Sequence, residues 1–256
     1  MTSDRIARGA VTLAGLVAVW QVVVWATGVA PFLLPPPIRV ATVWWEHSGY
    51  LLEHAAVTAT EMGLGLLLGA TIGAASAILI STFAPARRWL LPVLVVSQAV
   101  PVFALAPLLV LWLGYGLASK VAMATLIIYF PVAAAFLDGL RRTEIGWIDL
   151  GRVMTADARP WSVLWRIRVP AALPSLGSGL RVAAAVAPIG AVVGEWVGSS
   201  AGLGYAMLHA NARMQTDLMF AALATLATLA LILYFSLDWM LRRALPWQPE
   251  SGPVVP

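Results

Sequence analysis

The sequence predicts an all-α, polytopic membrane protein with about six transmembrane helices, and three observations support this. Hydrophobic residues make up 61% of the 256 residues and charged residues only 11%, with a mean hydropathy of +0.86. A soluble domain of this length cannot bury so much apolar side chain. Apolar stretches of roughly 20 residues, enough to cross about 30 Å of hydrocarbon, recur along the chain. The basic residues also gather on alternate connections between these stretches.

The predicted spans define three units along the chain. The first span begins like a secretory signal, but its apolar run is longer than a signal core and no small-residue cleavage site follows, so we expect a retained helix. The units are an N-terminal helix with an outer interfacial segment (1–54), a transmembrane domain (55–241) and a cytoplasmic tail (242–256). The six spans lie near 9–30, 55–83, 90–113, 119–137, 175–198 and 218–241.

Orientation follows from the basic residues, because cytoplasmic loops of membrane proteins carry an excess of Lys and Arg. With the N-terminus in the cytoplasm, twelve of the sixteen basic residues fall on the cytoplasmic side. Arg39, Lys120 and Arg213 fall outside, and Arg181 lies near the inner end of the fifth span, where a long side chain can reach the headgroups. We therefore expect both termini in the cytoplasm. The positive net charge then reflects topology and not binding of nucleic acid.

The connection after the first span has the character of an outer membrane interface. Prolines at 31 and 35–37 end the first helix, because proline lacks a backbone donor and restricts the residue before it. Residues 38–52 then mix Trp and Tyr with charged side chains, and such rings favour the headgroup zone. His47 and His54 are seven residues apart with no third ligand, so we do not predict a metal site there.

The second span presents Gly65, Gly69 and Gly73 at intervals of four. One face of this helix is therefore nearly bare backbone, and another helix can approach it closely by van der Waals packing. Two interpretations stay open at this point: a static helix contact, and an interface that moves during function.

Prolines interrupt the third span at Pro92, Pro101 and Pro107, around Ser97 and Gln98. Proline leaves backbone carbonyls without partners, and irregular backbone at membrane depth is tolerated mainly where it faces protein or a water-filled path. We therefore assign Ser97, Gln98 and Pro101 to a candidate translocation path.

Two acidic residues, Glu61 and Glu195, are expected within or beside the hydrocarbon, where an ionised group marks a function or a buried partner. Glu195 ends the fifth span, before a glycine-rich break and a short polar segment, 205–217, that should lie at the outer mouth. Either Glu195 contacts cargo, or it fixes this break through backbone donors and Arg213. The remaining candidate path residues are Trp196, Tyr205 and Asn211.

Nothing in the sequence predicts chemistry by the chain itself. Cysteine is absent, Lys120 is the single lysine, and no G-x-x-x-x-G-K-[ST] phosphate loop is present. The three histidines have no serine or carboxylate arrangement around them. We therefore expect no enzyme activity, cofactor or metal in this chain.

The one long charged stretch, residues 140–174, lies between the fourth and fifth spans. Its apolar residues fall at helical spacing with charged residues between them, which predicts a short amphipathic helix. A second helical run over 161–167 is expected to stop at Pro170. The apolar residues of the first helix are Ile145, Ile148, Leu150, Val153 and Met154.

The end of this stretch, R-V-P-A-A-L-P at 168–174, together with the two predicted helices, resembles the EAA loop of binding-protein-dependent ABC importer permeases. The resemblance covers about residues 35–245. The start of the loop departs from the family pattern, E-A-A, three residues and glycine. Counting back from Pro170 puts Gly151, Arg152 and Val153 at E-A-A and Asp157 at the glycine. Shifting the alignment by two residues puts Asp149, Leu150 and Gly151 at E-A-A instead, with Thr155 at the position of the glycine. Both alignments of the loop to the family pattern stay open.

The resemblance implies a type I ABC importer permease fold in the inner membrane, with a cytoplasmic coupling helix that docks on a separate ATP-binding subunit. That subunit binds and hydrolyses ATP. Two copies of the permease form the pore as a homodimer, and an extracytoplasmic substrate-binding protein delivers the cargo. Closure of the ATPase then alternates the pore between inward and outward access. The residues that we assign to coupling are Asp149, Gly151, Arg152, Val153, Met154, Thr155, Asp157 and Pro170.

Within that family the chain is most similar to the nitrate, sulfonate and taurine branch, and especially to its permeases for thiamine-precursor pyrimidines (hydroxymethylpyrimidine), through residues 179–198 and 210–220. A heteroaromatic cargo suits a path with Trp196, Tyr205 and an amide. A sulfonate, taurine or nitrate would need arginine or helix N-termini in the path, and Arg213 is the outer candidate. The alternatives from another class are an ATP-independent secondary transporter or channel and a membrane scaffold, which neighbouring genes would distinguish.

Overall fold

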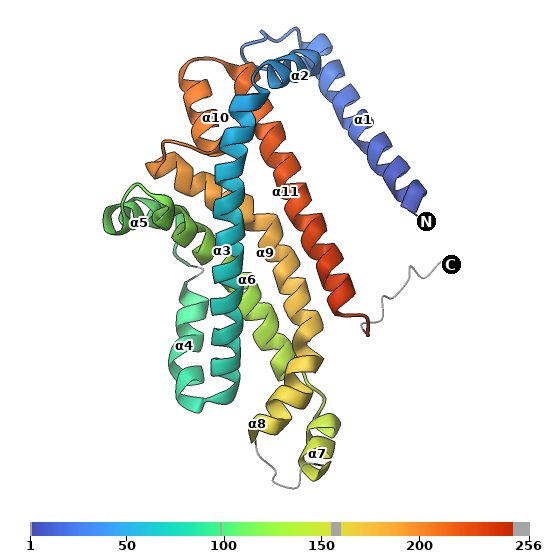
Figure 1. The fold of residues 1–256 in the computed structure, drawn as a ribbon, viewed down its shortest axis with the longest axis vertical. Coiled ribbons are helices and arrows are strands. Elements are labelled where there is room, and N and C mark those ends of the chain that lie inside the picture. The colour runs from blue at the N-terminus through green and yellow to red at the C-terminus, as the bar shows by residue number, and fades with distance from the viewer. Residues whose placement is uncertain (1, 98, 155–159, 248–256) are drawn as a thin grey trace.

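The computed structural model describes residues 2–97, 99–154 and 160–247, and none of these residues lies in a strand (Figure 1). Within this part, five helices are long and apolar enough to cross a membrane, which confirms the all-α membrane architecture. Each contains most of one predicted span. They are α1 (Thr2–Thr27), α3 (Ser48–Thr82), α6 (Leu117–Arg141), α9 (Val169–Gly198) and α11 (Thr216–Ala244).

Helices α3, α6 and α9 form the centre of the molecule, with α6 packed along both of the others. Small residues allow the close approach. A Cβ atom at Gly69 would lie 2.6 Å from Cγ2 of Ile128, and one at Gly190 would lie 2.7 Å from Cα of Ala124. A methyl group at Gly65 would overlap the side chain of Ala124. The glycine face predicted on the second span therefore holds α3 against α6 of the same chain.

The third predicted span, 90–113, is a broken segment and not one helix. α4 (Ala84–Val96) ends before Ser97, and the chain resumes after Pro101 as a 3-10 turn, η1 (Val102–Leu105), and α5 (Ala106–Leu113). α4 runs alongside α3, whereas α5 turns across the bundle (Figure 1). Pro101, which lacks a backbone donor, lies at this break, just before η1. Five continuous spans and this broken segment account for the six predicted spans.

Helices α2 (Pro37–Glu46) and α10 (Leu203–Ala212) close one end of the bundle, which we call the α10 end. They join α3 and α11 through a buried apolar cluster that includes Leu51, Leu203 and Ala222. α2 occupies the predicted interfacial segment, although residues 48–52 already belong to α3. α1 meets the bundle here, where Trp20 packs on Phe220 with 5.6 Å between ring centroids, and splays away from α11 towards the N-terminus (Figure 1).

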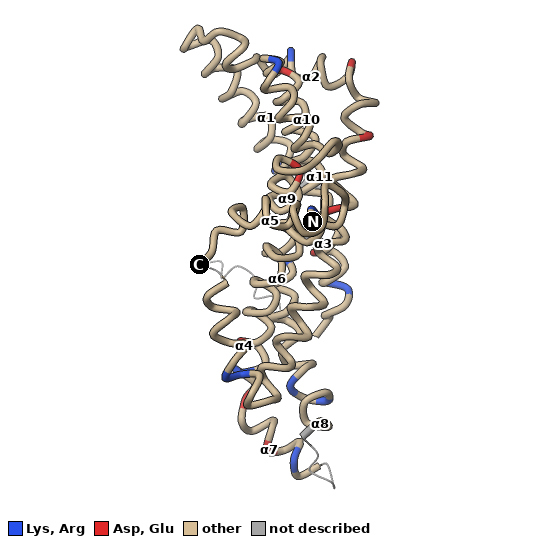
Figure 2. The backbone as a smooth tube through the Cα atoms, turned by 90° about the vertical axis from the view of Figure 1, so that its left-hand side faces the viewer, with Lys and Arg blue, Asp and Glu red and all other residues tan. Residues whose placement is uncertain are grey.

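The opposite end, which we call the α7 end, carries α7 (Ile145–Met154) and α8 (Pro160–Val163). Basic residues, all of them arginines, gather around α4, α7 and α8 here (Figure 2). The predicted stop at Pro170 is wrong, because α8 continues through a π-helical turn, η2 (Leu164–Arg168), into α9. The proline ring crowds the carbonyl of the residue four positions earlier, Arg166, and that residue lies in the wider π turn.

Candidate functional site

A buried polar cluster lies at the α10 end, where α10 begins against α3 and α9. Glu195 is 1% exposed, and its Oε2 accepts hydrogen bonds from the backbone N–H groups of Gly204 and Tyr205. Its Oε1 accepts a hydrogen bond of 2.6 Å from the Thr58 hydroxyl. The first N–H groups of a helix have no partners within the helix and favour a negative charge. Glu195 therefore caps α10 from a neighbouring helix.

Two α3 residues complete this cap. Nδ1 of His54 accepts a hydrogen bond of 2.9 Å from the N–H of Gly202, and Oγ1 of Thr58 accepts one of 2.8 Å from the next N–H along the chain. Gly202 has a φ of +110°, and the Glu195 carboxylate occupies the space that a Cβ atom would need there. The geometry supports the interpretation that Glu195 fixes the break through backbone donors. Arg213, the other predicted partner, follows the opposite end of α10.

A second carboxylate lies beside the cap. Glu61 on α3 is fully buried, and its Oε1 is 3.5 Å from Nζ of Lys120 on α6, which is also buried. Glu195 is the other acidic neighbour of Glu61. Lys120, which the sequence predicts on the outer side, is thus buried in the first turn of α6, and the ion pair with Glu61 compensates this burial. Two carboxylates therefore lie side by side here, and one of them, Glu61, pairs with an ammonium group.

Four aromatic rings lie in a row that passes through this cap, and we call them the ring row. The centroid distances are 4.3 Å from Tyr50 to His54, 5.8 Å from His54 to Tyr205, and 4.2 Å from Tyr205 to His209. The two end members, Tyr50 and His209, are exposed. Trp196 is half exposed, and its indole N–H donates a 3.1 Å hydrogen bond to the first turn of α10. The α10 end therefore presents aromatic faces next to buried charges.

The structure brings three of the predicted path residues together, since Glu195, Trp196 and Tyr205 all contact the start of α10. Asn211 is exposed near the other end of that helix. Ser97 and Pro101 flank the break in the third segment, where the Ser97 hydroxyl bonds the Leu94 carbonyl at 2.8 Å. Gln98 lies outside the described residues.

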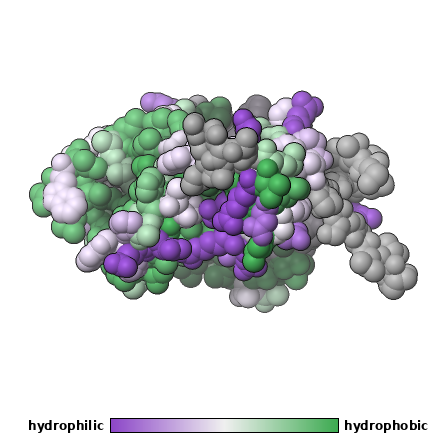
Figure 3. All heavy atoms as spheres, turned by 90° about the horizontal axis from the view of Figure 1, so that it is seen from below, coloured by the Kyte–Doolittle hydropathy of each residue, from purple (hydrophilic) through white to green (hydrophobic). Residues whose placement is uncertain are grey.

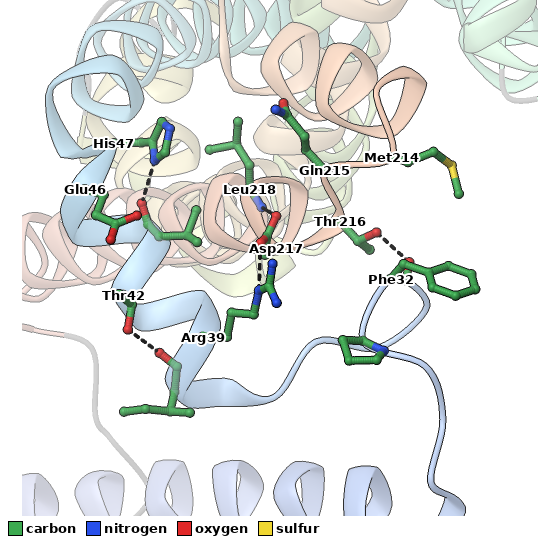
Figure 4. Close-up of a pocket in the computed structure, with 13 residues that line it drawn as sticks. Phe32, Arg39, Thr42, Glu46, His47, Met214, Gln215, Thr216, Asp217 and Leu218 are labelled. Carbon is green, nitrogen blue, oxygen red and sulfur yellow. Dashed lines mark hydrogen bonds and ion pairs between the residues drawn. The ribbon is translucent and has the colours of Figure 1, made fainter.

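A pocket of about 860 Å³ opens at the α10 end between α2, the loop before it and the start of α11 (Figure 4). Nε of Arg39 and Oδ2 of Asp217 form an ion pair of 3.0 Å in its wall. The Thr216 hydroxyl donates a hydrogen bond to the Phe32 carbonyl and so ties the two segments together. Phe32 and Met214 are exposed apolar side chains at this pocket, and Met214 has a φ of +58°, which is uncommon outside glycine.

Helix α7 presents apolar side chains to its surroundings. Val153 is 83% exposed and Met154 is 76% exposed, while the neighbouring charges of Asp149 and Arg152 pair with each other at 3.0 Å. Seen from the α7 end, hydrophobic surface borders a hydrophilic band (Figure 3). A contiguous apolar face of this kind marks a contact with protein or membrane. Two further predicted coupling residues, Thr155 and Asp157, lie outside the described residues.

The base of α7 is anchored to the membrane helices. Gly151 is buried, and a side chain there would overlap Cδ1 of Ile167 in η2. Nη2 of Arg168 donates a 2.9 Å hydrogen bond to the carbonyl of Leu140 at the end of α6. The same elements enclose a groove of about 500 Å³ that reaches Pro170. The other apolar residues of this groove include Trp147, Leu150, Met154, Ile167 and Trp247.

Sequence reasoning missed His54, Thr58 and Lys120 as members of the buried cluster. A local signal existed for the first two: with Glu61 they form a polar i, i+4, i+7 set on one face of an apolar helix. No comparable signal marks Lys120, because its partner is on another helix. Among the described residues, no group of three His, Cys, Asp or Glu side chains could hold a metal ion.

Comparison with known proteins gives one family and several relatives. Residues 65–246 match the model of the family described as "Binding-protein-dependent transport system inner membrane component". A probable ABC transporter permease protein of Haemophilus influenzae is 55% identical, covering 89% of this chain and 92% of the relative.

Two further relatives are the formylaminopyrimidine transport permease protein ThiX of Halalkalibacterium halodurans and the riboflavin transport system permease protein RibX of Chloroflexus aurantiacus. ThiX is 34% identical, and the match covers 92% of this chain and 94% of ThiX. RibX is 37% identical, and the match covers 93% of this chain and 89% of RibX. A solved chain of the inward-facing MetNI methionine ABC transporter has a TM-score of 0.68 at 19% identity, covering 77% of this chain and 97% of that one. This last likeness shows the fold.

Proposed function

The chain belongs to the family of binding-protein-dependent transport system inner membrane components, and on this premise we propose that it forms the translocation path of an ATP-driven importer for a thiamine-precursor pyrimidine. ATP hydrolysis takes place in a separate ATP-binding subunit that docks on α7. A second permease copy completes the path, and an extracytoplasmic binding protein delivers the cargo at the α10 end. The α7 end is cytoplasmic in this proposal, in agreement with the arginines that gather there.

The observation that carries the proposal is the exposed apolar face of α7 on an anchored helix. Val153 and Met154 are largely exposed, and Met154 also borders the groove beside α7, whereas Gly151 packs inward on Ile167. A soluble subunit that covers this face buries apolar surface, which is favourable by about 25 cal/mol per Å². The groove beside α7 can receive a further apolar side chain of that subunit. An isolated secondary transporter has no use for such a face.

One continuous helix connects this docking face with the α10 end. Residues Trp161–Gly198 form 38 residues of uninterrupted helix, about 57 Å long at a rise of 1.5 Å per residue. Ile167, at one end, contacts α7, and Glu195, at the other, holds the first turn of α10. A displacement of α7 by the ATPase therefore reaches the opposite side of the membrane through α9 as a lever. Opening and closing of the path by this lever is the proposed mechanism.

The ring row supports a planar heteroaromatic cargo. Its rings offer stacking faces, and the half-exposed indole of Trp196 lies beside them. Formylaminopyrimidine and riboflavin, the compounds named for two relatives, are themselves heteroaromatic. An anionic sulfonate would need a cation. Arg39 at this end is already paired with Asp217, so the exposed Arg213 after α10 is the candidate for an anion, against four rings that suit a heteroaromatic cargo. A pyrimidine is therefore favoured over sulfonate, taurine or nitrate.

The pocket at the α10 end is the proposed contact for the binding protein. It faces outward, combines a charged wall with the exposed Phe32 and Met214, and is built from segments that the Thr216 contact to Phe32 joins. Exposed apolar side chains that border a pocket mark a surface for contact with another protein.

Uptake into proteoliposomes tests the function. The tagged chain is reconstituted with candidate ATP-binding and substrate-binding subunits from the same organism, and labelled hydroxymethylpyrimidine, taurine and nitrate are compared. We expect ATP-dependent uptake of the pyrimidine alone. Uptake of taurine or nitrate in its place would overturn the cargo assignment, and uptake without ATP or the ATPase subunit would overturn the importer assignment.

A further inference from the structure

Side chains from two other helices hold four successive backbone N–H groups at the start of α10. The N–H of Gly202 donates to Nδ1 of His54, and the next N–H donates to Oγ1 of Thr58. The following two N–H groups both donate to Oε2 of Glu195. All three side chains are buried, and we call them the α10 latch. Since the first N–H groups of a helix have no partner within it, the latch fixes where α10 begins.

His54 can make its bond only as a neutral ring. A neutral imidazole has one N–H group and one acceptor nitrogen, whereas a protonated imidazole has two N–H groups and no acceptor. Nδ1 of His54 accepts from the N–H of Gly202, so the ring proton is on Nε2. A second proton would be added at Nδ1 and would place two N–H donors face to face. Histidine ordinarily gains this proton near pH ~6.5, within the range that a cell surface meets.

The other charged and titratable groups near His54 belong to three helices and one loop. They are Tyr50 and Glu53 on α3, Tyr205 and His209 on α10, Glu195 on α9, which is reached through the Thr58 hydroxyl, and Arg213 after α10. Among them, His209 has the same ordinary titration range as His54. His209 is exposed and packs on the ring of Tyr205, whereas His54 bonds the backbone at the start of α10. The two histidines can therefore be told apart by experiment.

We propose that protonation of His54 opens the α10 latch and releases the start of α10. The Glu195 carboxylate fills the space beside Gly202, so the repelled N–H of Gly202 moves away from α3 and α9. Thr58 and Glu195 still hold the next three N–H groups, which confines the change to the first turn. His54 also stacks on Tyr205, so this movement interrupts the ring row. The α10 end would then present a different aromatic surface in acid than at neutral pH.

Hydrogen–deuterium exchange of the purified full-length chain tests the α10 latch. Mass spectrometry follows peptides that cover residues 202–205 at about pH 8 and about pH 5, with rates corrected for the intrinsic effect of pH on amide exchange. We expect protection of these peptides to fall about ten-fold at the lower pH, which is the effect of leaving one buried donor without its acceptor. Peptides from the middle of α6 should keep their protection.

The decisive variant is His54→Asn. Oδ1 of asparagine can take the place of Nδ1 and accept the same hydrogen bond at either pH. This variant should therefore keep its protection in acid, whereas the matched control His209→Asn should lose protection as the wild type does. A wild type whose protection does not change would overturn the proposal. An equal loss in His54→Asn would also overturn it, because the acid sensitivity would then belong to another group, such as Glu195.

A second variant tests the proposal without changing His54. The chain contains three histidines, so His47→Asn/His209→Asn leaves His54 as the single one, and both changes are at exposed positions. After purification through a tag without histidine, ¹⁵N NMR of the labelled ring should show Nδ1 gaining a proton over the pH range in which protection falls. A ring that stays neutral while protection falls, or gains the proton while protection stays, would contradict the proposal. Neither experiment needs transport, so both are independent of the proposed function.

Discussion

Nζ of Lys120 lies 3.5 Å from Oε1 of Glu61, with both side chains buried where α3 meets α6. The carboxylate of Glu195, on α9, accepts hydrogen bonds from the backbone N–H groups at the start of α10. Three charged side chains on three different helices therefore form one cluster, and removing any one of them changes the charge balance for the other two. Water cannot screen this imbalance, because all three residues are buried.

Lys120→Met should destabilise the protein strongly, because it leaves the buried Glu61 carboxylate without its cation. Breaking a buried ion pair from one side costs about 3–5 kcal/mol. The double variant Glu61→Gln/Lys120→Met, which removes the charge from both partners, should regain most of this loss. Thermal unfolding in detergent and the yield of monodisperse protein measure the effect. The control Arg142→Met breaks the exposed pair with Asp138 and should change little. A double variant as unstable as Lys120→Met would argue against the pair.

Glu195→Gln should lower protein yield and reduce uptake of all cargoes alike. The amide of glutamine offers one acceptor oxygen where the carboxylate offers two, so a donor would face a backbone N–H of α10 or the Thr58 hydroxyl. An unsatisfied buried donor costs about 1–3 kcal/mol. Glu53→Gln, an exposed change on α3, is the control for loss of a carboxylate. A normal yield with lost uptake of one cargo would instead make Glu195 a cargo contact.

The long apolar helices could be predicted from the sequence because composition and length alone decide whether a segment suits a bilayer. The glycine spacing on α3 likewise predicted a close helix contact. The partner, α6, could not be predicted, since spacing within one helix says nothing about which helix faces it. For the same reason the burial of Lys120 could not be predicted, since its partner, Glu61, lies on another helix.

The continuous helix through Pro170 shows a different limit. Proline removes a backbone donor, and from the sequence this predicts a helix end. The π-helical turn of η2 accommodates the ring, and Ile167 of this turn packs against Gly151 on a separate element, α7. The consequence for the proposed mechanism is large, because the segment that contacts α7 and the segment that holds α10 belong to one helix, Trp161–Gly198, and not to separate helices.

Gly65→Ala should destabilise the protein, whereas Gly63→Ala should not, although the two glycines lie on the same helix. A methyl group at Gly65 would overlap the side chain of Ala124, and overpacking of this kind costs about 1–3 kcal/mol. A methyl group at Gly63 meets no heavy atom within 4 Å, so the variant should gain about 0.5–1 kcal/mol from the better helix propensity of alanine. Thermal unfolding of both variants checks the difference. Equal melting temperatures would show that the contact of α3 with α6 is loose.

Val153→Glu should abolish co-purification of the ATP-binding subunit and leave the permease in the membrane. Val153 is 83% exposed, so the charge has no effect on packing within the chain but would be buried on docking. Burial of an unpaired carboxylate opposes the contact strongly. Val153→Met, which keeps an apolar side chain at this position, is the matched control and should retain the subunit. Met154→Glu should repeat the loss, because Met154 is 76% exposed on the same turn. Retention of the subunit by both glutamate variants would move the docking face away from α7, whatever cargo the permease carries.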